Sequence, residues 1–161
     1  MEVSRPVRVH RTYTQTLIAP PEQVFPLLCP VREVEWANDW NPRQVIAESG
    51  FVELGCVFVT PDKPQDSIWV VTQWDPREFF VEFTKVTPEF TVGKIEIRLR
   101  RGDGELTLAD ISYCLTALSE KGSEFVTQFT AEYYKVFMKE WESEINHYLQ
   151  TGTKKEKQSS Q

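Results

Sequence analysis

The sequence predicts an α+β domain in which an antiparallel sheet of seven strands packs against one long C-terminal helix. Three observations predict it. A strand-like segment near the N-terminus is followed by two short helical segments, at 20–28 and 31–37. Six more strand-like segments then follow one another, separated by short turns. The last periodic segment, 121–149, repeats an apolar residue, almost always aromatic, every four positions, as one amphipathic helix would.

Residues 7–19 are rich in β-branched side chains with polar alternates, which favours a strand. Pro20 and Pro21 suit the start of a helix, and Glu22 suits its first turn. Pro26 keeps this helix short, and Pro30 disfavours helical geometry at the residue before it. We therefore expect two short helices in place of one long one.

The six later strands are predicted by alternating side chains and by turn residues between them. In 92–101, Ile95, Ile97 and Leu99 share one face, and charged residues occupy the other. Such half-polar strands are typical of an antiparallel sheet with one solvated face. The predicted ranges are 43–49, 56–60, 67–74, 78–86, 92–101 and 105–118.

Composition limits the functions that fit this domain. The chain has 161 residues, of which 40% are hydrophobic and 12% aromatic, so one domain can bury a large core. A net charge of −6 disfavours nucleic-acid binding, which needs clustered Lys and Arg. No apolar run approaches the ~20 residues of a membrane span, and the N-terminus lacks an apolar signal segment.

The cysteines and the C-terminus give two further expectations. Cys29, Cys56 and Cys114 are widely spaced and odd in number, so we expect reduced thiols and a cytoplasmic protein. We expect residues 1–150 to form a single domain and the polar tail 151–161 to be disordered.

Three stretches carry a family resemblance. TLIAPPEQVFPLL (16–28) looks like a first strand running into a first helix, and FTAEYYKVFMKEWESEINHYL (129–149) looks like a terminal helix of the START/Bet v 1-like superfamily. This superfamily is also called SRPBCC or polyketide cyclase/dehydrase-like. CPVREVEW (29–36), followed by Trp40, is similar to a bacterial subgroup of it. The resemblance covers about residues 8–150.

The resemblance implies the helix-grip fold, a curved seven-stranded antiparallel sheet wrapped around a long C-terminal helix, with two short helices after the first strand. It also implies a cavity between sheet and helix that holds an apolar or amphipathic small molecule. Aromatic side chains offer large contact areas to such a ligand. The alternative is that these large apolar side chains are ordinary core, and we interpret Phe125 and Ile145 that way. The candidate lining residues are Trp36, Trp40, Trp69, Tyr113, Phe129, Tyr133 and Phe137.

Few residues point to a reaction, and we assign no catalytic residue. His10 and His147 have no second ligand at metal spacing, so we expect neither a metal site nor a cofactor. Arg32, Glu33 and Glu35 are candidates for a polar mouth of the cavity. A carboxylate there could act as a general base if burial raised its pKa, and the alternative is a solvated face with weak ion pairs.

Three functions stay open. A small-molecule binding domain needs only the cavity, and the sequence favours it. An enzyme of cyclase, dehydratase or hydrolase type would bring two or more titratable groups together in the cavity. A protein-interaction module of the chaperone-activator type would expose an apolar patch instead. The sequence leaves a homodimer open.

Overall fold

The computed structural model describes residues 1–157 and contains one antiparallel sheet of seven strands. The strand order is β1-β7-β6-β5-β4-β3-β2, so only β1 is out of sequence order. The bounds are β1 (Arg8–Leu17), β2 (Gln44–Ile46), β3 (Val57–Thr60), β4 (Ser67–Asp75), β5 (Phe80–Thr87), β6 (Thr91–Arg101) and β7 (Thr107–Ala117). The predicted sheet is confirmed, and most strand ends lie within a few residues of the predicted ones.

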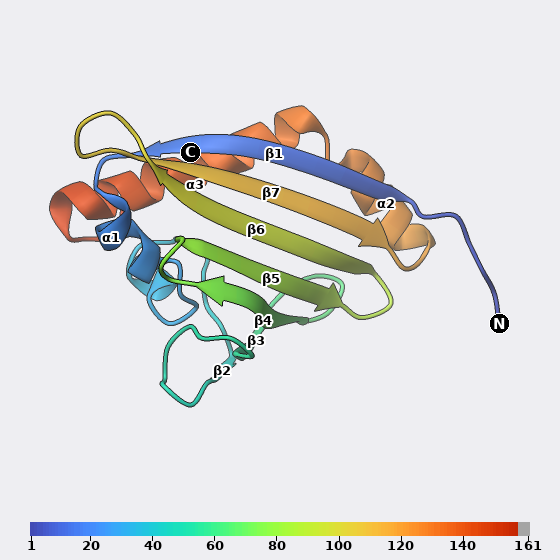
Figure 1. The fold of residues 1–161 in the computed structure, drawn as a ribbon. Helices are drawn as coiled ribbons and strands as arrows, with labels where there is room; N and C mark the ends of the chain where they lie inside the picture. Colours follow the sequence, from blue (N-terminus) through green and yellow to red (C-terminus); the bar gives the residue numbers. More distant parts are fainter. Residues whose placement is uncertain (158–161) are drawn as a thin grey trace.

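Two helices at the C-terminus, α2 (Glu120–Gln128) and α3 (Ala131–Thr151), lie along one face of the curved sheet (Figure 1). The prediction of one helix over 121–149 is wrong. Thr130 has extended backbone (φ −74°, ψ 164°), and its hydroxyl accepts a hydrogen bond from the Tyr133 amide at 3.1 Å. This is an N-cap that begins a new helix. The chain therefore changes direction at Phe129 and Thr130.

The segment between β1 and β2 contains the short helix α1 (Pro21–Val24) and two 3₁₀ turns, η1 (Phe25–Leu27) and η2 (Glu33–Glu35). The predicted second helix over 31–37 is thus only a 3₁₀ turn of three residues. Pro20 precedes α1 in extended conformation, and Pro21 occupies its first turn. These pieces lie beside the end of the sheet (Figure 1).

The helices pack on the sheet through a face adjacent to the predicted aromatic stripe. Tyr134, Met138 and Ile145 of α3 are buried. Tyr133 and Phe137 of the stripe remain 55% and 38% exposed. At Tyr134 and Met138 the core face of α3 is therefore one residue away from the stripe, whereas Ile145, which belongs to the stripe and was expected to be core, is buried.

Gly122 brings α2 close to the turn between β5 and β6. A Cβ atom at Gly122 would lie 1.9 Å from the Phe90 carbonyl oxygen, so only glycine fits there. Ser119 caps this helix by accepting from the Gly122 amide at 3.1 Å.

The described chain ends in a turn after α3. Gly152 takes the left-handed conformation (φ 74°) that commonly ends a helix. Beyond it, the Lys155 carbonyl accepts from Asn38, and Lys157 pairs with Asp39. Of the tail predicted to be disordered, 158–161 lie outside the described residues. No helix within residues 1–157 is long and apolar enough to cross a membrane.

Candidate functional site

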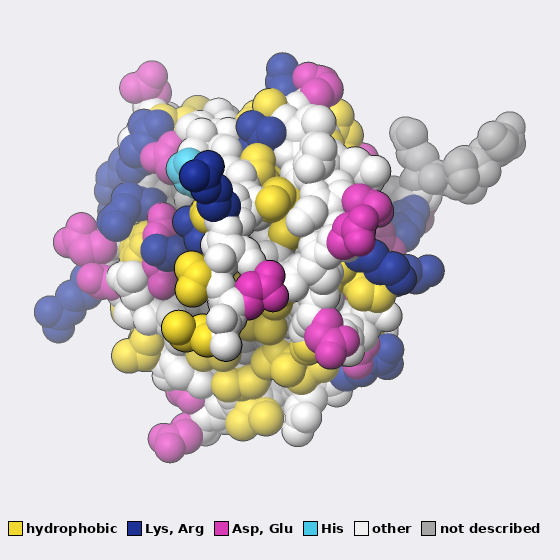
Figure 2. All heavy atoms as spheres, turned by 90° about the vertical axis from the view of Figure 1, so that its right-hand side faces the viewer, with side chains coloured by type: hydrophobic (Ala, Val, Ile, Leu, Met, Phe, Trp, Pro, Cys, Tyr) yellow, Lys and Arg dark blue, Asp and Glu magenta, His cyan; other side chains and the backbone are white. Residues whose placement is uncertain are grey.

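A cavity of about 470 Å³ lies between the sheet and the two C-terminal helices. Its floor comes from β3 to β7, its roof from α2 and α3, and its rim from the loops after η2 and β3. Figure 2 views the molecule from the α2 end, where hydrophobic side chains reach the surface between acidic ones. Phe125 and Phe137 both line the cavity, and each is 38% exposed.

Aromatic rings from neighbouring strands form the sheet side of the cavity. The Phe58 and Trp69 rings stack with centroids 5.3 Å apart and an interplanar angle of 15°. Trp40, from the loop before β2, packs edge-on against both at 5.9 and 5.8 Å. Phe83 of β5 contacts the same pair from the other side. These rings hold one another in place, so this wall is preformed.

Tyr113 of β7 is the centre of a second aromatic group, which faces the helices. Its ring centroid lies 6.1 Å from that of Phe129 and 5.9 Å from that of Phe137. Phe129 in turn packs against Tyr133 at 5.4 Å. The bend between α2 and α3 places Phe129 here, and the Phe129 carbonyl accepts from the Arg11 side chain at 3.1 Å.

Six of the seven predicted aromatic residues line the cavity: Trp40, Trp69, Tyr113, Phe129, Tyr133 and Phe137. Trp36 does not, and that prediction is corrected here. It is fully buried and donates its indole N–H to the Leu27 carbonyl at 3.0 Å. Its ring packs on Trp141, with centroids 5.3 Å apart. Phe125, predicted as ordinary core, lines the cavity instead.

The predicted polar mouth divides into two parts. Arg32 and Glu35 lie outside the cavity and form an ion pair with each other at 3.1 Å. Tyr148 donates to the same Glu35 carboxylate at 2.7 Å. The hydrogen bond from Arg32, with that from Tyr148, lowers the pKa of Glu35. Only Glu33 of the three lines the cavity.

The Glu33 carboxyl makes no hydrogen bond to any side chain or amide of residues 1–157. Glu33 is half-buried, and partial burial of its carboxyl among the residues that line the cavity raises its pKa from 4.5 to about 8. Tyr113 lies near enough for the charge of Glu33 to act on it. Burial raises the pKa of Tyr113, and Glu33 raises it further. Near neutral pH, the cavity thus holds an acid and a phenol that both keep their protons.

Charged residues surround the rest of the opening. Lys85 pairs with Asp62 at 2.9 Å, and its ammonium lies 5.0 Å from the Trp69 ring centroid. Glu140 and Glu144 reach the opening from α3. Burial raises the pKa of Glu144, although hydrogen bonds from Asn38 oppose the shift.

Sequence reasoning missed several lining residues: Phe58, Phe83, Phe90, Lys85, Glu140, Trp141 and Glu144. For the strand residues a signal existed, because Phe58 and Phe83 follow the alternation of their strands. Alternation groups residues by face, but it does not say which face covers the cavity. Trp141 continues the four-residue repeat of Tyr133 and Phe137 on α3, so a signal existed for it as well. The repeat does not say how far along the helix the cavity extends, nor that Glu140 and Glu144 border it.

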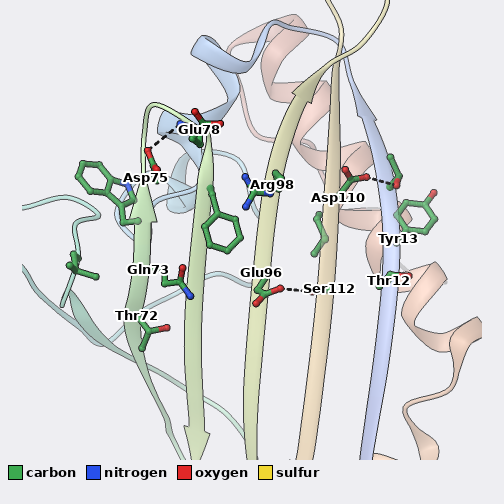
Figure 3. A pocket seen from close by; sticks show the side chains of 15 residues that line it. Thr12, Tyr13, Thr72, Gln73, Asp75, Glu78, Glu96, Arg98, Asp110 and Ser112 are labelled. Atoms are coloured by element: carbon green, nitrogen blue, oxygen red, sulfur yellow. Dashed lines mark hydrogen bonds between the residues drawn. The ribbon is translucent and has the colours of Figure 1, made fainter.

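A second hollow of about 1260 Å³ lies on the outer face of the sheet (Figure 3). Its polar groups largely satisfy one another. Asp110 accepts from Thr14 and Arg100, both at 2.7 Å, and the Arg98 guanidinium stacks on the Phe80 ring at 4.4 Å. It lies on the face of the sheet turned away from the helices (Figure 3). The aromatic-lined cavity beneath the helices is therefore the candidate site.

Comparison with solved structures confirms the predicted helix-grip fold. Norcoclaurine synthase from Thalictrum flavum is 9% identical, with a TM-score of 0.65 over 94% of this chain and 98% of that one. Ara h 8.0201 is 12% identical, with a TM-score of 0.61 over 89% and 99%. The Zhui aromatase/cyclase from Streptomyces sp. R1128 is 15% identical, with a TM-score of 0.60 over 90% and 98%. No family model matches the chain, and no curated protein sequence matches it.

Proposed function

We propose that this protein binds one apolar or amphipathic small molecule in the cavity between the sheet and the C-terminal helices. The observation that carries the proposal is the aromatic-lined cavity of about 470 Å³. Small-molecule sites in proteins commonly measure ~300–1,000 Å³ and combine apolar walls with a few polar groups. Here rings from both the sheet and the helices form much of the wall, and Glu33 and Tyr113 are among the polar groups that line it.

Binding can be tested with a neutral apolar fluorophore, N-phenylnaphthylamine, whose emission rises in an apolar site. Phe137→Ala removes a ring that lines the cavity and is already 38% exposed, so it should cost little stability. We expect this variant to weaken binding about five- to thirtyfold, the effect of losing ~1–2 kcal/mol of contact. Phe51→Ala is the matched control, because Phe51 is 52% exposed and lies outside the cavity.

Equal affinity of wild type, Phe137→Ala and Phe51→Ala would place the probe elsewhere and contradict the proposal. Absence of any saturable binding by this and other apolar probes would contradict it as well. The cavity favours a binder over the protein-interaction module, since that function requires no enclosed space.

One observation favours a second candidate function, an enzyme that uses acid–base chemistry. Two titratable groups, Glu33 and Tyr113, line the same cavity, and the pKa of Glu33 is about 8. A general acid or base works best when its pKa lies near the working pH. Norcoclaurine synthase and the Zhui aromatase/cyclase share this fold. Mass spectrometry of bound ligands after incubation separates the candidates, because only an enzyme converts its ligand, and Glu33→Gln should stop that conversion.

A further inference from the structure

We propose that the ligand of this cavity carries a protonated amine on an aromatic or apolar body, and that the Glu33 carboxylate pairs with the amine. The inference deepens the proposed binding function and rests on it. Three features of the cavity support it: the sign of its charges, the unpartnered state of Glu33, and the rings around Glu33.

The charges that line the cavity are mostly negative. Five carboxyl groups line it, against two lysines: Glu33, Asp39, Asp62, Glu140 and Glu144, against Lys63 and Lys85. Two of these carboxylates are already paired, Asp62 with Lys85 and Asp39 with Lys157, which leaves Glu33, Glu140 and Glu144 against Lys63. An anionic ligand would meet repulsion at this opening, whereas a cation is drawn to it.

Glu33 has no cation of its own. The nearest basic residue in the sequence, Arg32, turns away and pairs with Glu35 outside the cavity. No described residue donates a hydrogen bond to the Glu33 carboxyl. A buried carboxylate is stable only with a partner, and the protein leaves that partner to be supplied from within the cavity.

The surrounding rings suit a cation as well. Tyr113 is near Glu33, and Phe129 and Phe137 pack around Tyr113. Ammonium groups bind favourably over aromatic faces within ~6 Å. The protein already uses this contact in the same cavity, where the Lys85 ammonium lies 5.0 Å from the Trp69 centroid. The other rings provide room for the ligand's apolar body.

Amine binding should depend on pH. With a pKa of about 8, Glu33 is mostly protonated at pH 7 and mostly ionised at pH 9. An alkylamine stays charged over this range. Affinity should therefore rise about tenfold from pH 7 to 9. Besides Glu33, the titratable groups that line the cavity are Tyr113 and Tyr133 and the charged residues already named, and Glu144 is the other carboxyl among them whose pKa is raised.

A matched set of probes tests the inference: naphthylethylamine, naphthylethanol and naphthylacetate, which share one aromatic body and differ in charge. Calorimetry should show the amine binding at least tenfold tighter than the alcohol at pH 8, and the acetate weakest. Glu33→Gln should reduce the amine's affinity to that of the alcohol and remove its pH dependence. Glu35→Gln is the matched control and should keep the preference for the amine.

The outcomes separate the amine inference from the proposed binding function. If the alcohol and the amine bind wild type equally, or if Glu33→Gln still prefers the amine, the inference is wrong and the binding function stands. If no member of the set binds at any pH tested, the inference and the proposed function both fail. The pH series on wild type needs no variant, so it remains decisive even if Glu33→Gln folds poorly.

Discussion

At the scale of single residues, Trp36 and Trp40 show how a short irregular segment separates two similar side chains. They are four residues apart, a spacing that would place both on one face of a regular helix. The 3₁₀ turn ends at Glu35, and Asp39 takes a left-handed conformation (φ 61°). Trp36 therefore enters the core, and Trp40 turns to the cavity. Sequence reasoning recognised the pair but had no means to predict this turn.

The two tryptophans should respond differently to the same substitution. Trp36→Phe removes the hydrogen bond to the Leu27 carbonyl inside the core. We expect it to lower the free energy of unfolding by about 1–3 kcal/mol and to leave probe affinity unchanged. Trp40→Phe should weaken probe binding, because Trp40 forms part of the cavity wall. Urea unfolding and probe titration of both variants measure this, and the reverse pattern would contradict the assignment.

Tyr133 and Tyr134 offer a second matched pair. Tyr134 is buried and donates its hydroxyl to the Ile111 carbonyl at 2.8 Å, which ties α3 to β7. Tyr133 is 55% exposed, and its hydroxyl donates to no described residue. Tyr134→Phe should therefore cost about 1 kcal/mol of stability, whereas Tyr133→Phe should cost almost nothing. Chemical denaturation of the two variants compares them directly, and equal losses would contradict the assigned contact.

At the scale of elements, the strands could be predicted well and the C-terminal helix only in part. Alternation over ten residues defines a strand such as β6, predicted at 92–101 and found at Thr91–Arg101. The helix break was missed because Phe125, Phe129 and Tyr133 keep a four-residue spacing across it. A signal was present: Thr130 followed by Ala131 and Glu132 suits an N-cap and an acidic first turn.

That cap gives a prediction for the break. Thr130→Ala removes the hydroxyl that accepts from the Tyr133 amide. We expect a loss of about 1 kcal/mol in unfolding free energy. Thr127→Ala is the control, since Thr127 is exposed within α2 and bonds only to the Ser123 carbonyl one turn earlier. Faster amide exchange at the start of α3 in Thr130→Ala alone would locate the effect. An equal change in both variants would rule out the cap as its cause.

At the scale of the whole molecule, the cavity joins residues from both ends of the chain. Glu33 and Trp40 come from the turns after β1, Tyr113 from β7, and Phe129 and Phe137 from the helices. Sequence spacing predicts which residues share an element's face, but it carries no distance between Glu33 and Tyr113. For that reason the sequence offered Arg32, Glu33 and Glu35 together as candidates, and it could not predict that only Glu33 of the three lines the cavity.

The free energy of unfolding of the whole molecule should depend on pH through the titration of Glu33. Carboxyls such as Asp110, whose pKa the Arg100 hydrogen bond lowers, stabilise the fold above their usual pKa and lose that contribution as the pH falls. The contribution of Glu33 to stability changes with pH in the opposite direction. Its pKa is about 8 in the folded state and near 4.5 when exposed, so its contribution is complete below pH 4.5 and is lost as the pH rises towards 8.

Glu33→Gln isolates this effect, because glutamine does not titrate. The unfolding free energy of the variant minus that of wild type should be constant below about pH 4.5, rise up to about pH 8, and then level off. One proton sets the slope at ~1.4 kcal/mol per pH unit or less. Glu35→Gln should show the reverse sign, a deficit that shrinks as the pH falls, since the pKa of Glu35 is lowered. Urea unfolding from pH 4 to 9 measures both curves. A flat difference for Glu33→Gln would mean that the carboxyl is solvated, and the buried anchor on which amine binding depends would not exist.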